Sequence, residues 1–314
     1  MNSVADSRPV ATPSENHDAA PEKLTLSGDL SELTKARLTL MVLLTTLAGY
    51  GLASHGPFDW LRLFHTLFGT ALVAVSSSIL NQALERHTDA LMHRTLMRPF
   101  VTGRLPLRGT ILAGIVLGVL GLAELWWFVN LTTMLLSALT LIIYVFVYTP
   151  LKKVSEINTL VGAIPGALPP LIGATAALGH PNVEGWTLFA LMAVWQLPHF
   201  YAIAWLHRDD YRAAGLLMVS ANDTTGRRTG IHAVVTAIIL IPVSLLPVWI
   251  GPSGLFYGVI AGVLSILFAV AAVRFARQPD NTTARVLFFA SIIYLPLVLI
   301  ALIVDIPIKH YLGW

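Results

Sequence analysis

Long apolar runs, separated by short polar or Gly/Pro-containing segments, cover the chain from residue 38 onward. A helix needs about 20 mostly apolar residues to cross the roughly 30 Å hydrocarbon core of a bilayer. Nine segments meet this requirement: 38–55, 63–84, 109–129, 131–149, 158–178, 186–206, 231–250, 253–273 and 286–306. The pattern predicts an all-α polytopic membrane protein, a bundle of nine transmembrane helices. Eight helices remain the alternative if 131–149 or 253–273 does not span.

Residues 1–32 differ from the rest of the chain, because they are polar and contain Pro, Ser, Asp and Glu. No basic start is followed by an apolar run, as in a secretory signal, and the acidic residues are untypical of an organellar transit peptide. We expect 1–32 to form a disordered tail and 33–314 to form a single transmembrane domain. The lack of a targeting signature favours a bacterial inner membrane over an organelle.

The composition agrees with a lipid environment. The chain is 55% hydrophobic and 12% charged, whereas soluble domains carry about 25% charged residues. There are no cysteines, which excludes thiol catalysis, disulfides, cysteine-ligated zinc and iron–sulfur clusters.

The basic residues are strongly segregated in the nine-helix arrangement. On one side only Arg62 and Lys309 are found, 2 of the 20 Lys and Arg residues. The other 18 lie on the opposite side: Arg8, Lys23, Lys35, Arg37, Arg86, Arg94, Arg98, Arg104, Arg108, Lys152, Lys153, Arg208, Arg212, Arg227, Arg228, Arg274, Arg277 and Arg285. The positive-inside rule makes this side cytoplasmic. The N-terminus is then cytoplasmic and the C-terminus outside, whereas eight spans would disturb the segregation.

A first polar cluster lies at the end of the second apolar run. Asn81, Glu85 and Asp89 are spaced i, i+4, i+8, so on a helix they share one face, within about 80° and over roughly 12 Å. Three such oxygen-bearing side chains suit a hard cation such as Mg²⁺, with phosphate oxygens and water as its other ligands. The alternative is a helix end at which the two carboxylates pair with arginines.

Cations lie close to this cluster in the sequence. Arg94 and Arg98 follow it at i, i+4 spacing, and arginines bind phosphates through planar forked contacts. Lys152 and Lys153 come after Pro150, at which we expect a helix to end. The two lysines either set the topology or bind a diphosphate.

A second cluster combines residues inside a span with residues at its edge. Gln196 and His199 lie well within the segment 186–206, where polar residues are functional candidates by default. Asp210 follows His199 by eleven residues, about 20° away around a helix and roughly 16 Å along it. His199 is either a group that orients an acceptor within the membrane or a histidine hydrogen-bonded to a neighbouring helix.

The segment 162–173 contains several glycines and three prolines inside a span. Such a helix is expected to be kinked or locally open. It serves either helix packing or a widened cavity wall that admits a bulky acceptor.

Residues 81–99, in which the acidic cluster is followed by arginines, resemble the first acidic motif of the intramembrane aromatic prenyltransferase superfamily. Asp-Ala-Leu-Met-His-Arg-Thr (89–95) is similar to the version in protoheme IX farnesyltransferases. Trp-Gln-Leu-Pro-His-Phe (195–200) and Arg-Asp-Asp-Tyr (208–211) resemble a second signature of that family, and Tyr-Thr-Pro-Leu-Lys (148–152) also matches it.

This resemblance extends over about residues 35–300 and implies an intramembrane prenyltransferase of nine helices. It implies Mg²⁺ as cofactor, farnesyl diphosphate and heme B as substrates, and heme O and diphosphate as products. Membrane lipid and the proteins of heme-copper oxidase assembly or heme A synthesis would be its partners, and no nucleic acid is expected.

The resemblance also suggests roles for individual residues. Expected catalytic residues are Asn81, Glu85, Asp89 and Asp210, the first three as Mg²⁺ ligands. Expected substrate-binding residues are Arg94, Arg98, Lys152, Lys153, Arg208, Gln196 and His199. His199 would orient the heme, for example as an axial ligand of its iron.

Two departures from the superfamily pattern bear on the acceptor. Glu85 stands where most members have Asp, and Asp209 and Asp210 are adjacent where quinone-type members carry DxxxD. The second departure argues against a second full metal site and against 4-hydroxybenzoate or chlorophyll acceptors. The rival interpretations are a prenyltransferase for a quinone precursor and a transporter, although a transporter would be expected to place its charges near the midplane.

Overall fold

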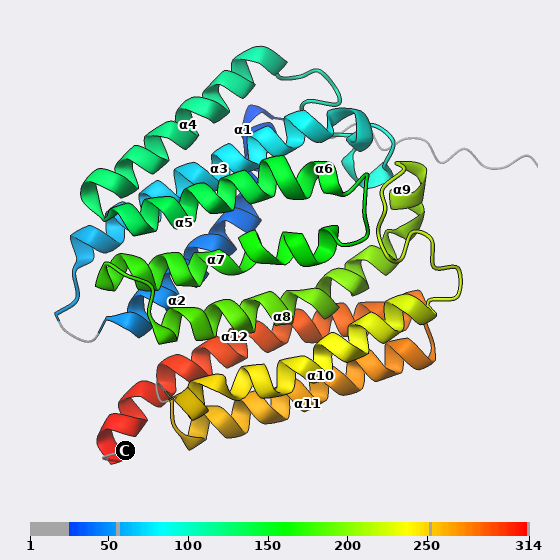
Figure 1. Ribbon diagram of the computed structural model, residues 1–314. Helices are drawn as coiled ribbons and strands as arrows, with labels where there is room; N and C mark the ends of the chain where they lie inside the picture. The colour runs from blue at the N-terminus through cyan, green and yellow to red at the C-terminus, as the bar shows by residue number, and fades with distance from the viewer. Residues whose placement is uncertain (1–24, 55–56, 251–252, 313–314) are drawn as a thin grey trace, which may run out of the picture.

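The computed structural model describes residues 25–54, 57–250 and 253–312, with side chains to residue 305 (Figure 1). Within these ranges the chain forms helices and no strands. They are α1 (Leu26–Leu33), α2 (Ala36–Ala53), α3 (Trp60–Asp89), η1 (His93–Thr95), α4 (Leu107–Phe128), α5 (Leu131–Ile142), η2 (Ile143–Tyr148), α6 (Thr149–Leu151), α7 (Asn158–Leu178), α8 (Val183–Leu206), α9 (Arg208–Ala213), α10 (Arg227–Ile250), α11 (Leu255–Arg277) and α12 (Asn281–Leu312).

Nine helical segments of the described chain are long and apolar enough to cross a membrane. This confirms the predicted all-α class and the number of spans. The two segments on which the eight-helix alternative depended, Leu131–Leu151 and Leu255–Arg277, are both among the nine. The difference in bounds that matters for the acidic cluster is in α3, which runs from Trp60 to Asp89 instead of 63–84. Its helix continues past the apolar run and so carries the acidic cluster.

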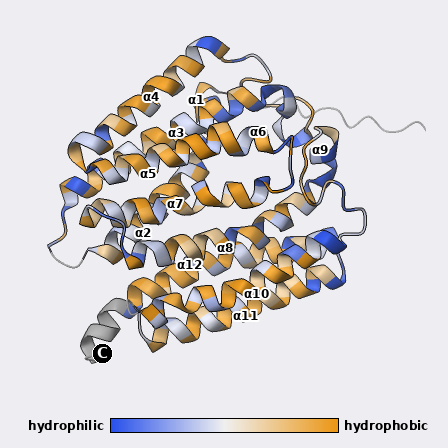
Figure 2. Ribbon diagram, in the orientation of Figure 1, coloured by the Kyte–Doolittle hydropathy of each residue, from blue (hydrophilic) through white to orange (hydrophobic). Residues whose placement is uncertain are grey.

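The two ends of the bundle differ in polarity. Hydrophilic residues gather at the end that carries α9, where α3, α6, α8 and α11 end and α2, α4, α7, α10 and α12 begin (Figures 1 and 2). We call it the basic end. Among the described side chains, Arg62 is the one Lys or Arg residue at the opposite end.

α7 lies in the middle of the bundle and packs against α2, α5 and α8 (Figure 1). A Cβ atom added to Gly173 would lie 1.9 Å from the carbonyl oxygen of Thr46, and one added to Gly49 would lie 1.9 Å from that of Pro170. Only glycine permits backbones to approach so closely. Gly166 likewise faces the side chain of Gln196.

This packing bears on the two interpretations of segment 162–173. α7 is a continuous helix despite its three internal prolines. Neighbouring helices occupy the space beside its glycines. These contacts support the packing interpretation of segment 162–173.

Part of the predicted disordered tail is helical. Leu26–Leu33 form α1, whose start is capped by the Thr25 hydroxyl accepting from the backbone N–H of Gly28. Asp29 is buried and pairs with Arg104, which follows α3 (2.8 Å). This pair holds α1 against the bundle. The rest of the tail, residues 1–24, lies outside the described residues.

Candidate active site at the basic end

A pocket of about 290 Å³ opens at the basic end. Its charged wall comprises Lys35, Glu85, Asp89, Arg94, Arg98 and Lys152. Its apolar wall comprises Leu38, Met92, Phe200, Ile203, Leu216 and Met218, while Tyr148, Thr159 and Tyr211 complete the lining. The two walls suit a molecule with an anionic head and an apolar chain.

The acidic face of α3 supplies the carboxylates of this pocket. Because α3 stays helical to its last residue, Glu85 and Asp89 lie one turn apart on the same face. Glu85 Oε1 accepts a hydrogen bond from Lys152 Nζ (2.7 Å), and Asp89 Oδ2 accepts one from Arg98 Nη1 (2.6 Å). Both carboxylates are thus neutralised by a cation from another segment.

Asn81 lies one turn deeper and is fully buried. Its Oδ1 atom accepts from Lys35 Nζ (2.8 Å), and its Nδ2 atom donates to the hydroxyl of Thr149 (2.9 Å). Asn81 therefore lies beneath the pocket lining, and it is connected to the pocket through Lys35.

Asp89 has one atom that its surroundings leave unpaired. The side chain is 1% exposed, and Oδ1 is buried with no hydrogen-bond partner. A buried carboxylate oxygen without a partner is costly, and a hard cation would satisfy it. No group of three or more His, Asp and Glu side chains converges anywhere in the described chain. A cation at Asp89 would therefore need oxygen ligands from a bound substrate.

A π-helical turn positions the tyrosines of the site. In η2 the backbone N–H and the hydroxyl of Thr149 both reach the carbonyl oxygen of Tyr144, five residues back (2.8 Å for the hydroxyl). Pro150 has no N–H and clashes with the carbonyl four residues before it, and the wider turn accommodates this. The expected helix end at Pro150 is wrong by one residue, because the helix continues to Leu151.

The same turn places two tyrosines beside lysines. The hydroxyl of Tyr144 accepts a hydrogen bond from Lys35 Nζ (3.1 Å), and Lys152 Nζ lies 4.4 Å from the centre of the Tyr148 ring. Short π-helical turns occur often at functional sites.

Lys152 keeps its charge in this setting. Burial alone would lower the pKa of its ammonium group, but Tyr148, Glu85 and Tyr144 act in the opposite direction and raise the pKa above the usual lysine value. The pocket therefore holds a permanent cation next to Glu85.

The loop after α3 is fixed by α9. Arg94 Nη2 donates to the hydroxyl of Tyr211 (3.0 Å), and the guanidinium lies 5.2 Å from the centre of that ring. Asp210 Oδ1 accepts a hydrogen bond from the backbone N–H of His93 (3.2 Å). Arg94 lines the pocket, whereas Asp210 lies outside the lining and holds the loop that carries Arg94.

Two predicted diphosphate ligands also lie outside the lining. Lys153 is exposed, and its ammonium group forms no hydrogen bond or ion pair with the described residues. Arg208 Nη1 donates to the carbonyl of Trp205 and to Asn281 Oδ1 (2.9 and 3.1 Å). Arg208 thus connects α8 with α12.

The polar residues inside α8 are engaged with neighbouring helices. Gln196 Nε2 donates to the carbonyl oxygens of Ala163 on α7 (2.8 Å) and Met192 (3.0 Å). His199 Nδ1 is hydrogen-bonded to the Ser291 hydroxyl on α12 (2.7 Å). Neither side chain lines the pocket.

The hydrogen bonds of Ser291 favour one tautomer of His199. The Ser291 hydroxyl has a single proton and lies within hydrogen-bond distance of the carbonyl of Phe288, which favours His199 Nδ1–H as the donor to Ser291 Oγ. Nε2 then carries a lone pair. The imidazole ring stacks between Trp195 and Phe288, with ring centres 5.3 and 5.1 Å away.

Residues 42–293 match the UbiA prenyltransferase family. The chain belongs to this family. Membership confirms the predicted class, a prenyltransferase built as a multi-pass membrane protein, and the transporter interpretation is set aside.

Relatives within the family are similar over their whole length. The chain is 42% identical over 288 residues to the protoheme IX farnesyltransferase of Solibacter usitatus, which covers 89% of this chain and 99% of the relative. It is 38% identical over 315 residues to that of Koribacter versatilis, with 97% and 99% covered. The predicted resemblance to protoheme IX farnesyltransferases is thereby confirmed.

Solved structures of UbiA proteins share the fold. A digeranylgeranylglyceryl phosphate synthase superimposes with a TM-score of 0.76 at 18% identity, over 88% of this chain and 97% of that one. A UbiA homologue from Archaeoglobus fulgidus, bound to GPP and Mg²⁺, superimposes with a TM-score of 0.63 at 18% identity, over 87% and 99%.

Lys35, Tyr144, Tyr148 and Tyr211 belong to the site, although their sequence positions do not predict it. In the sequence, Lys35 stands out only as a basic residue of the membrane edge. Its backbone has φ of 46°, which is uncommon for a residue other than glycine and turns the chain sharply between α1 and α2. No sequence pattern marks this conformation. The 148–152 motif contains both Tyr148 and Lys152, but only the lysine has a charge that predicts a role at the site.

Proposed function

We propose that this protein transfers the farnesyl group of farnesyl diphosphate to a vinyl group of heme B, with addition of water, to give heme O and diphosphate. The pocket at the basic end carries the proposal, because its charged wall and its apolar wall together fit a prenyl diphosphate. Heme B as the acceptor is supported by the similarity to protoheme IX farnesyltransferases over nearly the whole chain.

The charged wall would hold the diphosphate. Its four cations (Lys35, Arg94, Arg98 and Lys152) and two carboxylates sum to a formal charge of 4 − 2 = +2, which attracts an anion. Arg98 and Lys152 each use donors on a carboxylate, but a guanidinium has five donors and an ammonium group three. Each can therefore bind phosphate oxygens while it keeps its carboxylate in place.

Asn81, Glu85 and Asp89 would hold Mg²⁺, and the unpaired Oδ1 atom of Asp89 is the observation that fits this ion best. Mg²⁺ bound there would neutralise charge on the departing diphosphate. Asn81 Oδ1 is shared with Lys35, so we expect it to be the weakest of the three ligands.

The apolar wall would take the farnesyl chain. Leu38, Phe200 and Ile203 line it, and Phe200 and Ile203 belong to α8, which continues into the membrane. The carbon–oxygen bond of farnesyl diphosphate breaks, and the electron pair leaves with the diphosphate. An apolar wall limits capture of the allylic cation by water before the vinyl group reacts.

His199 would orient the heme. Its Nε2 lone pair is the kind of donor that binds heme iron, and its Nδ1–H bond to Ser291 fixes the ring. The heme vinyl carbon then bonds to the farnesyl carbon, and water adds to the resulting cation with loss of a proton. Asp210 would act by holding the backbone of His93, so we propose a positioning role for it.

The segregation of basic residues supports a bacterial inner-membrane location with the N-terminus and the active site on the cytoplasmic side. Farnesyl diphosphate is anionic and would then enter from the cytoplasm. The farnesyl group gives heme O a long apolar chain that keeps it in the membrane, so we propose that it passes by contact to proteins of heme A synthesis or heme-copper oxidase assembly.

Heme extraction from membranes tests the proposal. Membranes with and without the protein are supplied with farnesyl diphosphate and Mg²⁺, and the extracted hemes are separated by chromatography. We expect heme O only where the protein is present. Unchanged heme B together with a prenylated aromatic compound would instead identify a quinone-precursor acceptor.

A further inference from the structure

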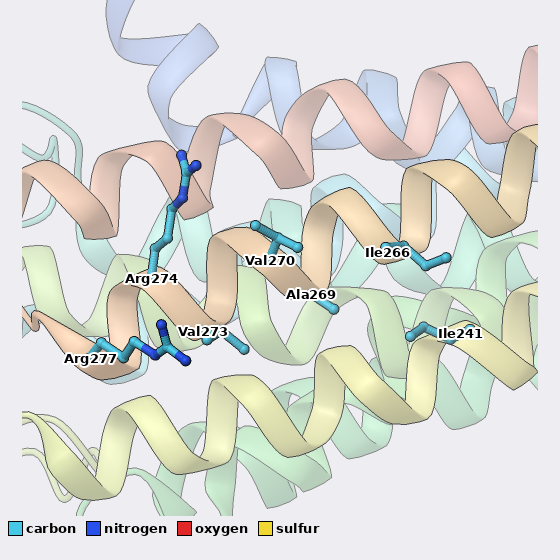
Figure 3. Close-up of a pocket in the computed structure, with 7 residues that line it drawn as sticks. All are labelled: Ile241, Ile266, Ala269, Val270, Val273, Arg274 and Arg277. Atoms are coloured by element: carbon cyan, nitrogen blue, oxygen red, sulfur yellow. The ribbon is translucent and has the colours of Figure 1, made fainter.

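A second pocket, of about 390 Å³, lies between α10 and α11, away from the candidate active site (Figure 3). Its apolar lining comprises Ile241 of α10 and Ile266, Ala269, Val270 and Val273 of α11. Ile266 and Val270 are 53% and 44% exposed, so this lining faces the surroundings of the bundle, which are lipid. We call it the α10–α11 pocket.

Arg274 and Arg277 line the pocket at the basic end, and their side chains extend to different sides of α11, that of Arg277 toward α10 (Figure 3). Both lie in the last turn of α11, and both are exposed. Among the described residues neither guanidinium has a hydrogen-bond or ion-pair partner. The nearby carboxylate of Asp280 accepts from the backbone and hydroxyl of Thr283 instead.

The two pockets therefore differ in how their cations are neutralised. In the candidate active site, Arg98 and Lys152 pair with carboxylates of the protein. In the α10–α11 pocket, both arginines lack such a partner among the described residues, so their donors are available to an anion from outside the protein. Guanidinium groups bind phosphate oxygens in forked, charge-assisted contacts.

The dimensions indicate which phosphate compound fits. Ile266 and Arg277 are eleven residues apart on one helix, about 16 Å. This is close to half of the roughly 30 Å hydrocarbon core, the depth of one leaflet. Cations stand at the headgroup level, and apolar side chains continue from there toward the middle of the membrane.

We propose that the α10–α11 pocket binds one anionic phospholipid of the leaflet at the basic end. Its phosphate contacts Arg274 and Arg277, and one acyl chain lies along the apolar lining. Two adjacent cations disfavour a headgroup that carries its own ammonium group, so the pocket selects an anionic lipid over a zwitterionic one. Free phosphate would leave the apolar lining unused.

Native mass spectrometry of the full-length protein in detergent micelles tests this proposal. The probes are phosphatidylglycerol, phosphatidylcholine with the same acyl chains, and inorganic phosphate. We expect the protein to retain one phosphatidylglycerol molecule in preference to phosphatidylcholine, with no competition from inorganic phosphate. Arg274→Gln combined with Arg277→Gln should weaken this binding on the order of 30-fold.

Two further variants separate a site from general surface charge. Arg37→Gln with Arg108→Gln removes the same charge from exposed arginines at the same end and should retain the lipid. Val270→Trp fills the apolar lining without altering the charge and should lose it. Equal loss in both double variants, retention in Val270→Trp, or equal binding of the two lipids would overturn the proposal.

Discussion

α3 and α8 both carry polar side chains within a membrane span, yet the two helices use them differently. On α3, Glu85 and Asp89 face a pocket, and each is held by a cation. On α8, Gln196 and His199 bond to the backbone of α7 and to Ser291 of α12. A position deep in the membrane is therefore not by itself evidence that a polar side chain binds a ligand. The α3 carboxylates differ in that they line a pocket, and Asp89 also has an unpaired oxygen atom.

The strongest test of the α3 side is Asp89→Asn. The change removes the charge that we propose binds Mg²⁺ and keeps the size of the side chain. We expect heme O formation to fall on the order of 100- to 1000-fold, measured in membranes with farnesyl diphosphate and heme B. Asp209→Asn alters an exposed carboxylate of α9 and should leave the rate unchanged. Near-normal turnover in Asp89→Asn would remove Asp89 from the metal site.

Lys152→Gln tests the cation next to Glu85, with its neighbour as a matched control. Lys152 lines the pocket, whereas Lys153 is exposed outside it. We expect Lys152→Gln to raise KM for farnesyl diphosphate roughly 10- to 100-fold, because a charged hydrogen-bond donor to phosphate is lost. Lys153→Gln should leave KM unchanged. Equal effects in both variants would mean that the lysines act only through the overall charge of the membrane surface.

His199→Ala tests whether α8 contributes to heme binding as well as to helix packing. We expect heme affinity, followed by the absorption spectrum of bound heme, to fall about tenfold or more, with KM for farnesyl diphosphate little changed. Ser291→Ala removes the hydrogen-bond partner of His199 but keeps Nε2, so its effect on the spectrum should be smaller. If both variants alter the spectrum equally, or neither does, His199 serves packing alone.

Asp210→Asn should have a smaller effect. The carboxylate holds the backbone N–H of His93, and a neutral amide oxygen can still accept that bond. We expect kcat to fall only a few-fold, because loss of charge weakens such a bond by about 1 kcal/mol. A loss as large as that of Asp89→Asn would place Asp210 in direct contact with substrate or metal.

The pH profile should show no contribution from Lys152. The pKa of Lys152 is raised above the usual lysine value. Below the pKa of the unfolded state, the charged form and its contribution to stability are therefore fully present. Both are lost only as the pH rises through the higher pKa of the folded state. Between about pH 6 and 9, well below the ordinary lysine pKa, KM should therefore not titrate through this group. A basic limb in that range that disappears in Lys152→Gln would contradict this.

The sequence was sufficient to predict the nine spans, because apolar length and basic segregation are local properties. It also placed Glu85 and Asp89 on one face, because that depends only on helical spacing. The partners of these residues could not be predicted in the same way. Lys152 is 67 residues from Glu85, and Lys35 reaches Asn81 and Tyr144 across a left-handed backbone turn. Such contacts depend on how the helices pack.

For the polar residues of α8, the sequence suggested a binding role that the packing of the helices does not require. Gln196 and His199 stand out in the sequence because polar groups are rare inside spans, but their hydrogen bonds all go to groups of the helix bundle itself. A helical wheel cannot reveal that Ala163 presents a carbonyl oxygen or that Ser291 presents a hydroxyl. For His199 the binding hypothesis now rests on one ring nitrogen, Nε2.

The π-helical turn Ile143–Tyr148 has a consequence for how this segment tolerates insertions and deletions. One residue more or less in a helix changes the direction of every following side chain by about 100°. The π-helical turn holds one residue more than an α-helical turn. Deletion of a single residue between 145 and 148 would therefore restore ordinary helical winding and leave Lys152 facing Glu85, whereas a deletion in the α-helical part that precedes the turn would rotate Lys152 away from Glu85. The hydropathy profile would hardly change in either variant, although the second would cost the pocket one side of its charged wall.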